Sequence, residues 1–340
     1  MKATIFAGDI VENNEEKLQN DTSISDNENQ ELWWLLLFGL LQDDLQNRWN
    51  EFTEQLMYDD RFSSSHEIVK LIKKLGKQVT SILPKGRELF RARIYHDNPL
   101  EDFIHDFYAS KSGDSSMPDG INIGSIDWSK NANTLIYPLI GTLDKNGALQ
   151  KSFFEKYQKW QDSSFRGYNE SDSDMPPKGK APEGRINPDK ISYLYLAEEA
   201  QTCIYEVRPI IGQHVSVATF VTQKDLRIYN LAYKFPNDYP NEEKLNISLF
   251  EYVCQQFSKP YTGKPLQYLP TQFLGEVIKN MGFDGLRFSS SLNKGGYNVV
   301  LFNNEFCKPV SSDFVRVDGI NLTISNPDLY LLEESMKKHS

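Results

Sequence analysis

Hydrophobic residues recur at helical spacing in the first part of the chain that we expect to be ordered, beginning at Glu31. Six apolar side chains step by three or four positions and so share one helix face: Phe38, Leu41, Leu45, Trp49, Phe52 and Leu56. A second stripe of the same kind follows: Ile68, Ile72, Leu75, Val79 and Ile82. Ser64 and Glu67 stand at capping-box spacing before it. We therefore predict two amphipathic helices that form a helical accessory region over residues 31–86.

The pattern changes from helical spacing to alternation at Glu88. Along residues 88–95, Phe90, Ala92 and Ile94 point to one face of a strand. The other face carries Arg91, Arg93 and Tyr95. The alternation therefore predicts a strand with one apolar face and one cationic, aromatic face.

The remaining elements show no regular alternation of strands and helices. Strands are predicted at residues 191–197, 215–221, 226–231, 285–289 and 298–302. A short helix from 198 to about 204 leads into an extended segment at 205–208, and longer helices are predicted at 242–257 and 271–281. This order predicts an α+β fold.

Composition divides the chain further. Residues 9–31 hold eight acidic residues and one lysine, so we expect residues 1–30 to be a flexible acidic segment. Residues 87–315 form the predicted catalytic domain. It carries an insertion at about 109–183 that is rich in Ser, Asp, Gly and Pro. Residues 316–340 are predicted to be a C-terminal extension.

Charge and length exclude several classes of protein. The 340-residue chain has 37 basic and 47 acidic residues, a net charge of −10, which argues against nucleic acid or an anionic membrane as the main partner. The apolar run at 32–41 has ten residues, whereas a membrane-spanning helix needs about 20. No secretory signal pattern is present at the N-terminus, so we expect a cytoplasmic protein.

Familiar catalytic and metal motifs are missing. The sequence has no GxGxxG, P-loop, GxSxG or HExxH pattern. Cys203, Cys254 and Cys307 are far apart, so we expect reduced thiols and neither a disulfide framework nor a metal site. The spacing of Arg61 and His66 occurs in some helical RNases, but Arg91 repeats it before a second histidine on a predicted strand, which makes it a weak signal.

Four separated segments carry a stronger signal when they are taken in order. They are ELFRARIY at residues 88–95, MPP through GRINP at 175–188, YLYLAEEAQTCIYEVRP at 193–209, and PTQ through GFDGLRFSS to NVVLF at 270–302. Together they resemble the RES domain family, over about residues 87–310. Each segment alone is a weak match, but four in the family's order make a specific one.

The resemblance implies an ADP-ribosyltransferase-like split β-sheet whose cleft holds NAD+. Members of the family act as bacterial toxins that degrade NAD+ by phosphorolysis or hydrolysis, and some are described as ADP-ribosylating a protein. NAD+ is thus expected as a substrate with no separate cofactor, and inorganic phosphate, water or a protein as acceptor. An antitoxin or regulatory protein is the expected partner, and a homo-oligomer stays open.

Carried over by motif, the functional positions of the family fall on five residues: Arg91, Arg185, Tyr195, Glu206 and Ser290. For the serine, Ser289 and Ser291 stay open as alternatives. Two second-rank sets are the substrate-binding candidates Arg93, Tyr95 and Tyr193, and Gln272, which we expect to brace the helix behind the cleft.

The chemistry of these residue types fits the implied reaction. Guanidinium groups grip phosphate oxygens, so Arg91 and Arg185 would bind the diphosphate. The ring of Tyr195 would stack on the cationic nicotinamide. Glu206 would stabilise the positive charge that the ribose develops as its bond to nicotinamide breaks. Ser290 would orient the ribose or the carboxamide.

Each residue taken alone also has an ordinary structural explanation. Glu206 and Arg208 could form a surface pair on a strand, and Tyr195 could be a half-buried aromatic of the sheet. Three functions therefore stay open: an NAD+-cleaving enzyme, a protein ADP-ribosyltransferase, and a non-catalytic NAD-binding or partner-binding module. Because the substrate carries phosphates, the acidic chain must surround a local cationic pocket.

Overall fold

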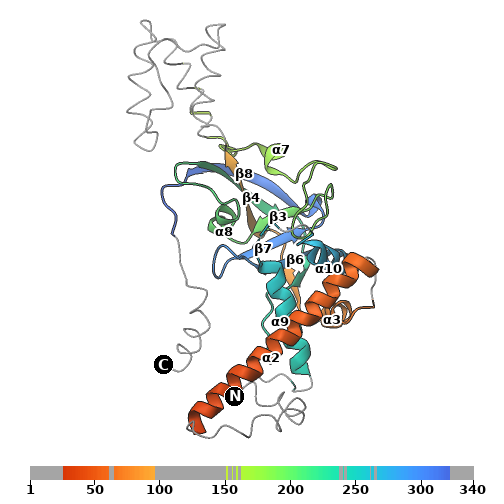
Figure 1. The fold of residues 1–340 in the computed structure, drawn as a ribbon. Helices are drawn as coiled ribbons and strands as arrows, with labels where there is room; N and C mark the ends of the chain where they lie inside the picture. Colours follow the sequence, from red (N-terminus) through yellow and green to blue (C-terminus); the bar gives the residue numbers. More distant parts are fainter. Residues whose placement is uncertain are drawn as a thin grey trace.

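The computed structural model of the chain describes residues 26–60, 65–95, 162–236, 243–260 and 266–321, with a few isolated positions between them. Its centre is a mixed eight-stranded sheet in the order β1-β5-β6-β7-β3-β2-β4-β8 (Figure 1). The strands are β1 Thr80–Leu83, β2 Glu88–Tyr95, β3 Leu194–Ala197, β4 His214–Thr222, β5 Leu226–Asn230, β6 Gly285–Ser289, β7 Tyr297–Leu301 and β8 Cys307–Arg316. Neighbouring strands are antiparallel except for the parallel pair of β5 and β6.

The sheet is split between β2 and β3. These two strands are joined at the register pair Phe90↔Ala197, whereas β2 and β4 pair along their whole length from Glu88↔Val221 to Tyr95↔His214. One half of the sheet is therefore β1-β5-β6-β7-β3 and the other is β2-β4-β8. The predicted α+β class with a split sheet and an N-terminal helical region is confirmed.

The helices are α2 Asp26–Glu54, α3 Glu67–Leu75, α7 Glu170–Ser173, α8 Ala200–Glu206, α9 Lys244–Ser258 and α10 Leu269–Asn280, with short helical turns η2 at Gln55–Asp59 and η5 at Asn304–Phe306. Two groups of them cover one face of the sheet, whereas the end of α7 is held by Arg91 and Arg93 on the opposite face of β2. Helices α2, α3, α9 and α10 share one hydrophobic core with strands β5, β6 and β7. Helix α8 packs instead on β2 and β4, through Cys203 against Ala92 and Val217. The two groups of helices therefore pack on separate parts of the same face of the sheet.

The N-terminal helices begin and end differently from the prediction. Helix α2 starts at Asp26, inside the segment expected to be flexible, and its Phe38 is 55% exposed although it was placed in the apolar stripe. Helix α3 ends at Leu75, and Thr80–Leu83 forms β1 against β5 instead of a last helical turn. Ile82 is therefore a strand residue and is 60% exposed. Pairing with β5 overrides the helical spacing of this short segment.

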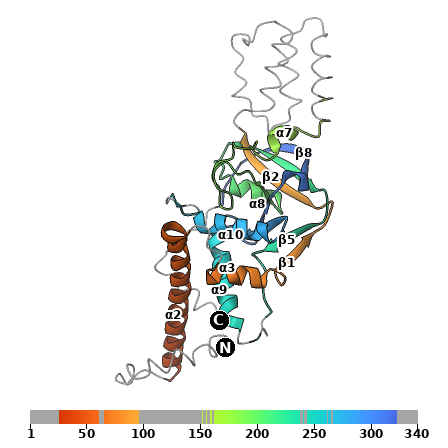
Figure 2. The same ribbon diagram turned by 90° about the vertical axis from the view of Figure 1, so that its right-hand side faces the viewer.

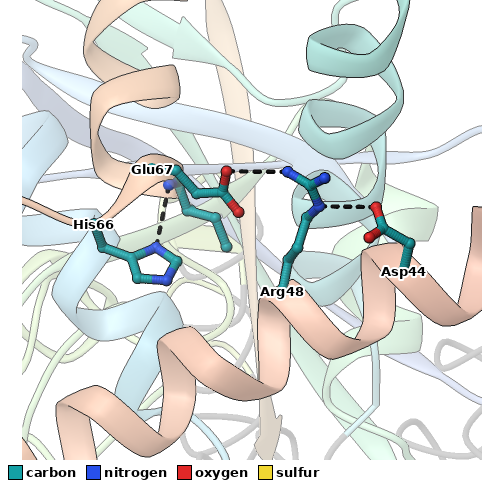
Figure 3. A network of polar contacts seen from close by, with 5 residues as sticks. Asp44, Arg48, His66 and Glu67 are labelled. Atoms are coloured by element: carbon teal, nitrogen blue, oxygen red, sulfur yellow. Dashed lines mark hydrogen bonds and ion pairs between the residues drawn. The ribbon is translucent and has the colours of Figure 1, made fainter. Parts of the chain in front are cut away.

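The first turn of α3 is capped by His66 and not by the expected Ser64, which lies outside the described residues. His66 Nδ1 accepts a hydrogen bond from the backbone N–H of Ile68 at 3.2 Å. Beside it, Arg48 of α2 contacts Asp44 at 2.8 Å and Glu67 of α3 at 3.0 Å (Figure 3). These ion pairs join α2 to the first turn of α3, and α2 also contacts α9 and α10 (Figure 2).

Strand β8 is absent from the sequence prediction, which ended the sheet at Phe302. It spans Cys307–Arg316 and pairs along β4 at the edge of the sheet. Other expected regions are only partly covered: the insertion is described from residue 162 and the C-terminal extension to residue 321. Within the described ranges, no helix has both the length and the apolar character needed to cross a bilayer.

Candidate functional site

A cavity of about 270 Å³ is lined by α8, by the segment that carries Arg185 and by residues of strands β2, β3, β6 and β7. Four of the residues carried over from the family motifs line it: Arg91, Arg185, Tyr195 and Glu206. They come from β2, from the segment before β3, from β3 and from α8. Residues far apart in the sequence thus meet at one concave place, as expected of a binding site.

Glu206 is the last residue of α8, so the helix continues through part of the segment 205–208 that was predicted to be extended. Its Oε1 atom accepts two hydrogen bonds of 2.7 Å, one from Ser290 Oγ and one from Asn298 Nδ2. Two donors on one oxygen fix the orientation of the carboxylate at the cavity wall. Glu206 is therefore held by side chains of the site and does not form the surface pair with Arg208 that was considered as an alternative.

Ser290 acts on the site through Glu206. Its hydroxyl donates to that carboxylate and also accepts the backbone N–H groups of Leu292 and Asn293, both at 3.1 Å. Ser289 and Ser291 are exposed at either side of it. Of the three candidate serines, Ser290 is the one in contact with Glu206, which supports its choice but gives it a positioning role.

Arg185 is held at the cavity by backbone carbonyl groups. Its Nη1 atom donates to the carbonyl oxygens of Phe257 and Lys259 at the end of α9. The guanidinium carbon lies 5.5 Å from the ring centroid of Tyr268 and 5.7 Å from that of Phe288. Burial lowers the pKa of Arg185, while the negative charge of Glu206 opposes this shift. The result is a fixed, partly desolvated cation beside the carboxylate.

Tyr195 is fixed through its hydroxyl group. The hydroxyl donates to Asn187 Oδ1 at 2.7 Å and accepts the N–H of Ile186 at 3.0 Å, and burial raises its pKa. Gly184 is needed at this point because a Cβ there would lie 2.4 Å from Asn187 Oδ1 and 2.8 Å from the Tyr195 hydroxyl oxygen. The aromatic wall and the segment that carries Arg185 are thereby locked together.

The first turn of α10 braces the same segment from behind. Thr271 Oγ1 donates to the carbonyl oxygen of Arg185 at 2.6 Å. Gln272 Nε2 donates to the carbonyl oxygen of Gly184 at 2.9 Å, and its side chain is buried. Gln272 therefore braces the segment in front of the helix.

Arg91 lines the cavity and also binds the turn that follows α7. Its Nη1 atom donates to the carbonyl oxygen of Ser173 at 2.6 Å and to that of Asp174. Arg93 Nη2 donates to the same Asp174 carbonyl oxygen at 3.0 Å. Burial lowers the pKa of Arg91 to about 9, and the positive charge of Arg93 adds to this, yet the guanidinium stays charged at neutral pH. Both arginines hold the turn after α7 against β2.

The structure does not bring the other second-rank candidates to the cavity. Arg93 is outside the lining and serves the Asp174 turn. The ring of Tyr95 packs on Tyr168 with centroids 4.6 Å apart. Tyr193 donates to Glu276 on α10 and accepts a hydrogen bond from Lys279 at 3.1 Å. These contacts give the two tyrosines roles in packing around the site.

Several lining residues were missed by sequence reasoning: Phe90, Ala92, Leu196, Ala197, Cys203, Val207, Phe288 and Asn298. Asn298 had one usable signal, since it is a polar residue at the start of an apolar strand. Cys203 is a free thiol whose Sγ donates to the carbonyl oxygen of Ala200 at 3.0 Å. Burial raises its pKa to about 12, so it stays protonated and is a poor nucleophile at neutral pH.

No metal centre is found among the described residues, where no group of three or more His, Cys, Asp or Glu side chains is placed to hold an ion. The chemistry that the cavity offers is therefore that of one carboxylate, cationic guanidinium groups, a tyrosine ring and an apolar floor. Such a set suits a ligand that carries both phosphate and a flat cationic ring.

Comparison with known proteins agrees with the motif resemblance. The family model described as the RES domain matches residues 155–319, just under half of the chain. This range includes Arg185, Tyr195, Glu206 and Ser290, whereas the strand with Arg91 lies before it. No curated protein matches the chain.

One similar solved chain belongs to the crystal structure of the M. tuberculosis MbcT–MbcA toxin–antitoxin complex. It has 16% sequence identity, the match covers 41% of this chain and 75% of that chain, and the TM-score is 0.28.

Proposed function

Residues 155–319 form a RES domain, and from this premise we propose that the protein cleaves the nicotinamide–ribose bond of NAD+. Water or inorganic phosphate accepts the ADP-ribosyl group, so the protein is an NAD+ glycohydrolase or phosphorylase. In a cell such an activity depletes NAD+, which would make the protein a toxin or a defence effector held in check by another protein.

The observation that carries this proposal is the meeting of Arg185, Tyr195 and Glu206 around one cavity. A ring wall, a fixed cation and an oriented carboxylate are the three features that NAD+ requires: a face for its nicotinamide, a partner for its phosphates and a negative charge beside its ribose. Each of the three is held by contacts to other parts of the fold. A binding module would have no need of a carboxylate fixed by two donors.

Glu206 has the main role in the proposed reaction. As the glycosidic bond breaks, its electron pair leaves with the nicotinamide nitrogen, which becomes neutral and needs no proton. The ribose carbon gains oxocarbenium character, and the Glu206 carboxylate stabilises that positive charge. An oxygen of water or phosphate then bonds to the ribose carbon, and the proton of an attacking water passes to a base or to solvent. The two hydrogen bonds to Oε1 keep the carboxylate in place during these steps.

Incubation of the purified protein with NAD+, with and without phosphate, and measurement of released nicotinamide tests the proposal. We expect turnover in the wild type and a loss of at least about a hundredfold in Glu206→Gln, since one preorganised electrostatic contact is typically worth that much. Glu199→Gln is the matched control, because Glu199 is an exposed glutamate just before α8. Absence of turnover in the wild type, also with candidate activating proteins, would refute the proposal.

Two further measurements separate the alternatives. If labelled ADP-ribose from NAD+ is found on a protein, the acceptor is a macromolecule and the enzyme is an ADP-ribosyltransferase. If calorimetry shows tight NAD+ binding without any turnover, the protein is a non-catalytic module. In either case Glu206→Gln indicates whether the carboxylate matters for chemistry or only for binding.

A further inference from the structure

Helix α8 carries Glu206 but is too short to fix its own orientation. It has seven residues, and no side chain caps its first turn. Isolated helices shorter than about 12–15 residues are marginal in water, so contacts with the rest of the fold must hold α8 in place. Its apolar contact, through Cys203 against Ala92 and Val217, is non-directional and does not by itself fix the rotation of the helix about its axis.

Two polar residues of α8 face the loop between β6 and β7. Thr202 and Glu206 are four positions apart, so they lie on the same side of the helix, one turn from each other. Asn293 of the loop donates from Nδ2 to Thr202 Oγ1 at 2.8 Å. Ser290, at the start of the loop, donates to the Glu206 carboxylate at 2.7 Å. The loop therefore holds α8 at two points, and two points on one side of a helix fix its rotation.

Asn293 also binds the residue that holds Glu206. Its backbone N–H donates to Ser290 Oγ at 3.1 Å. The side chain and the backbone of Asn293 therefore connect the two attachment points, and one turn of α8 closes the ring. In such a hydrogen-bonded network the position of each member depends on the others.

The shape of the loop brings Asn293 close to the helix. Backbone hydrogen bonds of 2.9 Å run from the N–H of Ser290 to the carbonyl oxygen of Gly296 and from the N–H of Gly296 to that of Asn293. Gly296 is needed here, because a Cβ there would overlap Thr202 Oγ1 and lie 2.9 Å from Asn293 Nδ2. Thr202 is completely buried, so its hydroxyl group depends on protein partners, and Asn293 supplies one of them.

We propose that Asn293 is a positioning residue of the candidate site, which aims the Glu206 carboxylate at the cavity by fixing α8 through Thr202. Asn293 is not among the residues that line the cavity, so its effect on a substrate bound there is exerted through the helix. The inference rests on the proposed function for its kinetic consequence. The attachment of α8 to the loop can be measured independently of that function.

Two substitutions that break the same contact test the inference. Asn293→Ala and Thr202→Val should each lower kcat for nicotinamide release by about tenfold or more and leave KM within about twofold, because misplacing a catalytic group by about 1 Å can cost a hundredfold. The double variant should be no slower than the slower single variant, since both substitutions remove one contact. Thr202→Ser, which keeps the hydroxyl group, should retain most of the wild-type kcat. Lys294→Ala, at the exposed neighbour of Asn293, is the control.

Thermal midpoints separate positioning from a merely structural role. Asn293→Ala leaves the buried Thr202 hydroxyl without this donor and should lower the midpoint by about 2 °C or more. Thr202→Val leaves only the half-buried amide of Asn293, which water can reach, and should lower the midpoint less. The inference therefore predicts similar losses of kcat at unequal midpoints. It is overturned if kcat of both variants stays within about twofold of the wild type, or if the loss appears only in KM.

A measurement without substrate keeps this test separate from that of the proposed function. Amide hydrogen exchange in residues 203–206 should be about tenfold faster in Asn293→Ala and Thr202→Val than in the wild type and in Lys294→Ala, since α8 is then held at one point fewer. Unchanged exchange would overturn the inference. If exchange is faster but the wild type itself releases no nicotinamide, the attachment of α8 is supported and the proposed function fails, which is a distinct result.

Discussion

The two groups of helices on the covered face of the sheet are stabilised in different ways. At the N-terminal side, Phe52 and Leu56 from α2 and η2 are fully buried with Ile68 of α3 in one apolar core. The ion pairs of Arg48 lie at its partly exposed rim. At the cavity side, the side chains of the candidate site are held in place by hydrogen bonds, such as those of Glu206 and Tyr195.

This difference has a physical consequence. Apolar burial is non-directional and sums over many small contacts, so the helical side is expected to depend on volume and to tolerate changes at its rim. A buried polar network depends on each partner, because a donor or acceptor left unpaired costs its desolvation. We therefore expect substitutions at the helical side to change stability, and those at the cavity side to change chemistry.

The largest expected effect is that of Phe52→Ala. Phe52 is fully buried, and its ring centroid lies 4.9 Å from that of His66 and 6.1 Å from that of Phe273 on α10. Its truncation should lower the free energy of unfolding by about 3–5 kcal/mol, measured by denaturant titration. The exposed Phe38 of the same helix is the control, and Phe38→Ala should change stability by less than about 0.5 kcal/mol. A small loss in Phe52→Ala would mean that α2 is not part of the core.

Part of this architecture could be predicted from spacing alone. The stripe that contains Phe52 and the strand at 285–289 follow from local periodicity, which tertiary contacts then reinforce. Strand β8 could not be found in this way, because Pro309, Ser311 and Asp313 make its sequence read as a loop and its place depends on pairing with β4. Ile82 fitted a helical stripe, yet pairing with β5 decided its conformation.

Only those site residues that the family motifs identify could be predicted from the sequence. They led to Arg185, Tyr195 and Glu206, which the fold brings together at the cavity. Asn298 was missed because its contact with Glu206 exists only when β7 lies beside β3 and α8 packs across them. The separation of Tyr193 from the cavity likewise depends on α10, whose Glu276 binds its hydroxyl group.

The next largest effect should come from the two donors that hold Glu206. Asn298→Ala and Ser290→Ala each remove one hydrogen bond of 2.7 Å to a carboxylate, a contact worth about 1.5–3 kcal/mol. We expect kcat for nicotinamide release to fall about tenfold or more while KM changes little, since the carboxylate is misplaced and not lost. Ser291→Ala, at the exposed neighbouring serine, should behave as the wild type. A change confined to KM would instead place Ser290 or Asn298 on the substrate.

A smaller change in the free energy of unfolding is expected at His66. This residue makes a polar contact, by capping α3, and an apolar one, by packing its ring on Phe52. Burial lowers its pKa, Lys70 adds to this, and Glu67 and Glu51 oppose it. The unfolded chain therefore takes up a proton at a higher pH than the folded one. The stability from His66 is complete above the ordinary histidine pKa of about 6.5 and is lost as the pH falls below it.

His66→Asn tests this sign, because asparagine caps a helix without titrating. Unfolding free energies of both proteins between about pH 5 and 7.5 should show a decline toward acid that is smaller in the variant. His214 also has a lowered pKa, from burial and the charge of Arg316, so the comparison is best made in a His214→Asn background. At neutral pH the variant should differ by about 1 kcal/mol or less. A steeper acid decline in His66→Asn would contradict the assignment.

The smallest change in the free energy of unfolding is expected for Arg48→Met. Arg48 forms the ion pairs with Asp44 and Glu67 that are shown in Figure 3. Arg48 and its two carboxylate partners are each about one third to one half exposed, and ion pairs of this kind contribute about 0–1 kcal/mol. The loss in unfolding free energy should therefore stay below about 1 kcal/mol and shrink further at high salt, which screens exposed charges. Methionine keeps most of the apolar stem, so the measurement isolates the charge. A loss comparable to that of Phe52→Ala would mean that charge pairing, and not apolar burial, holds α2 on α3.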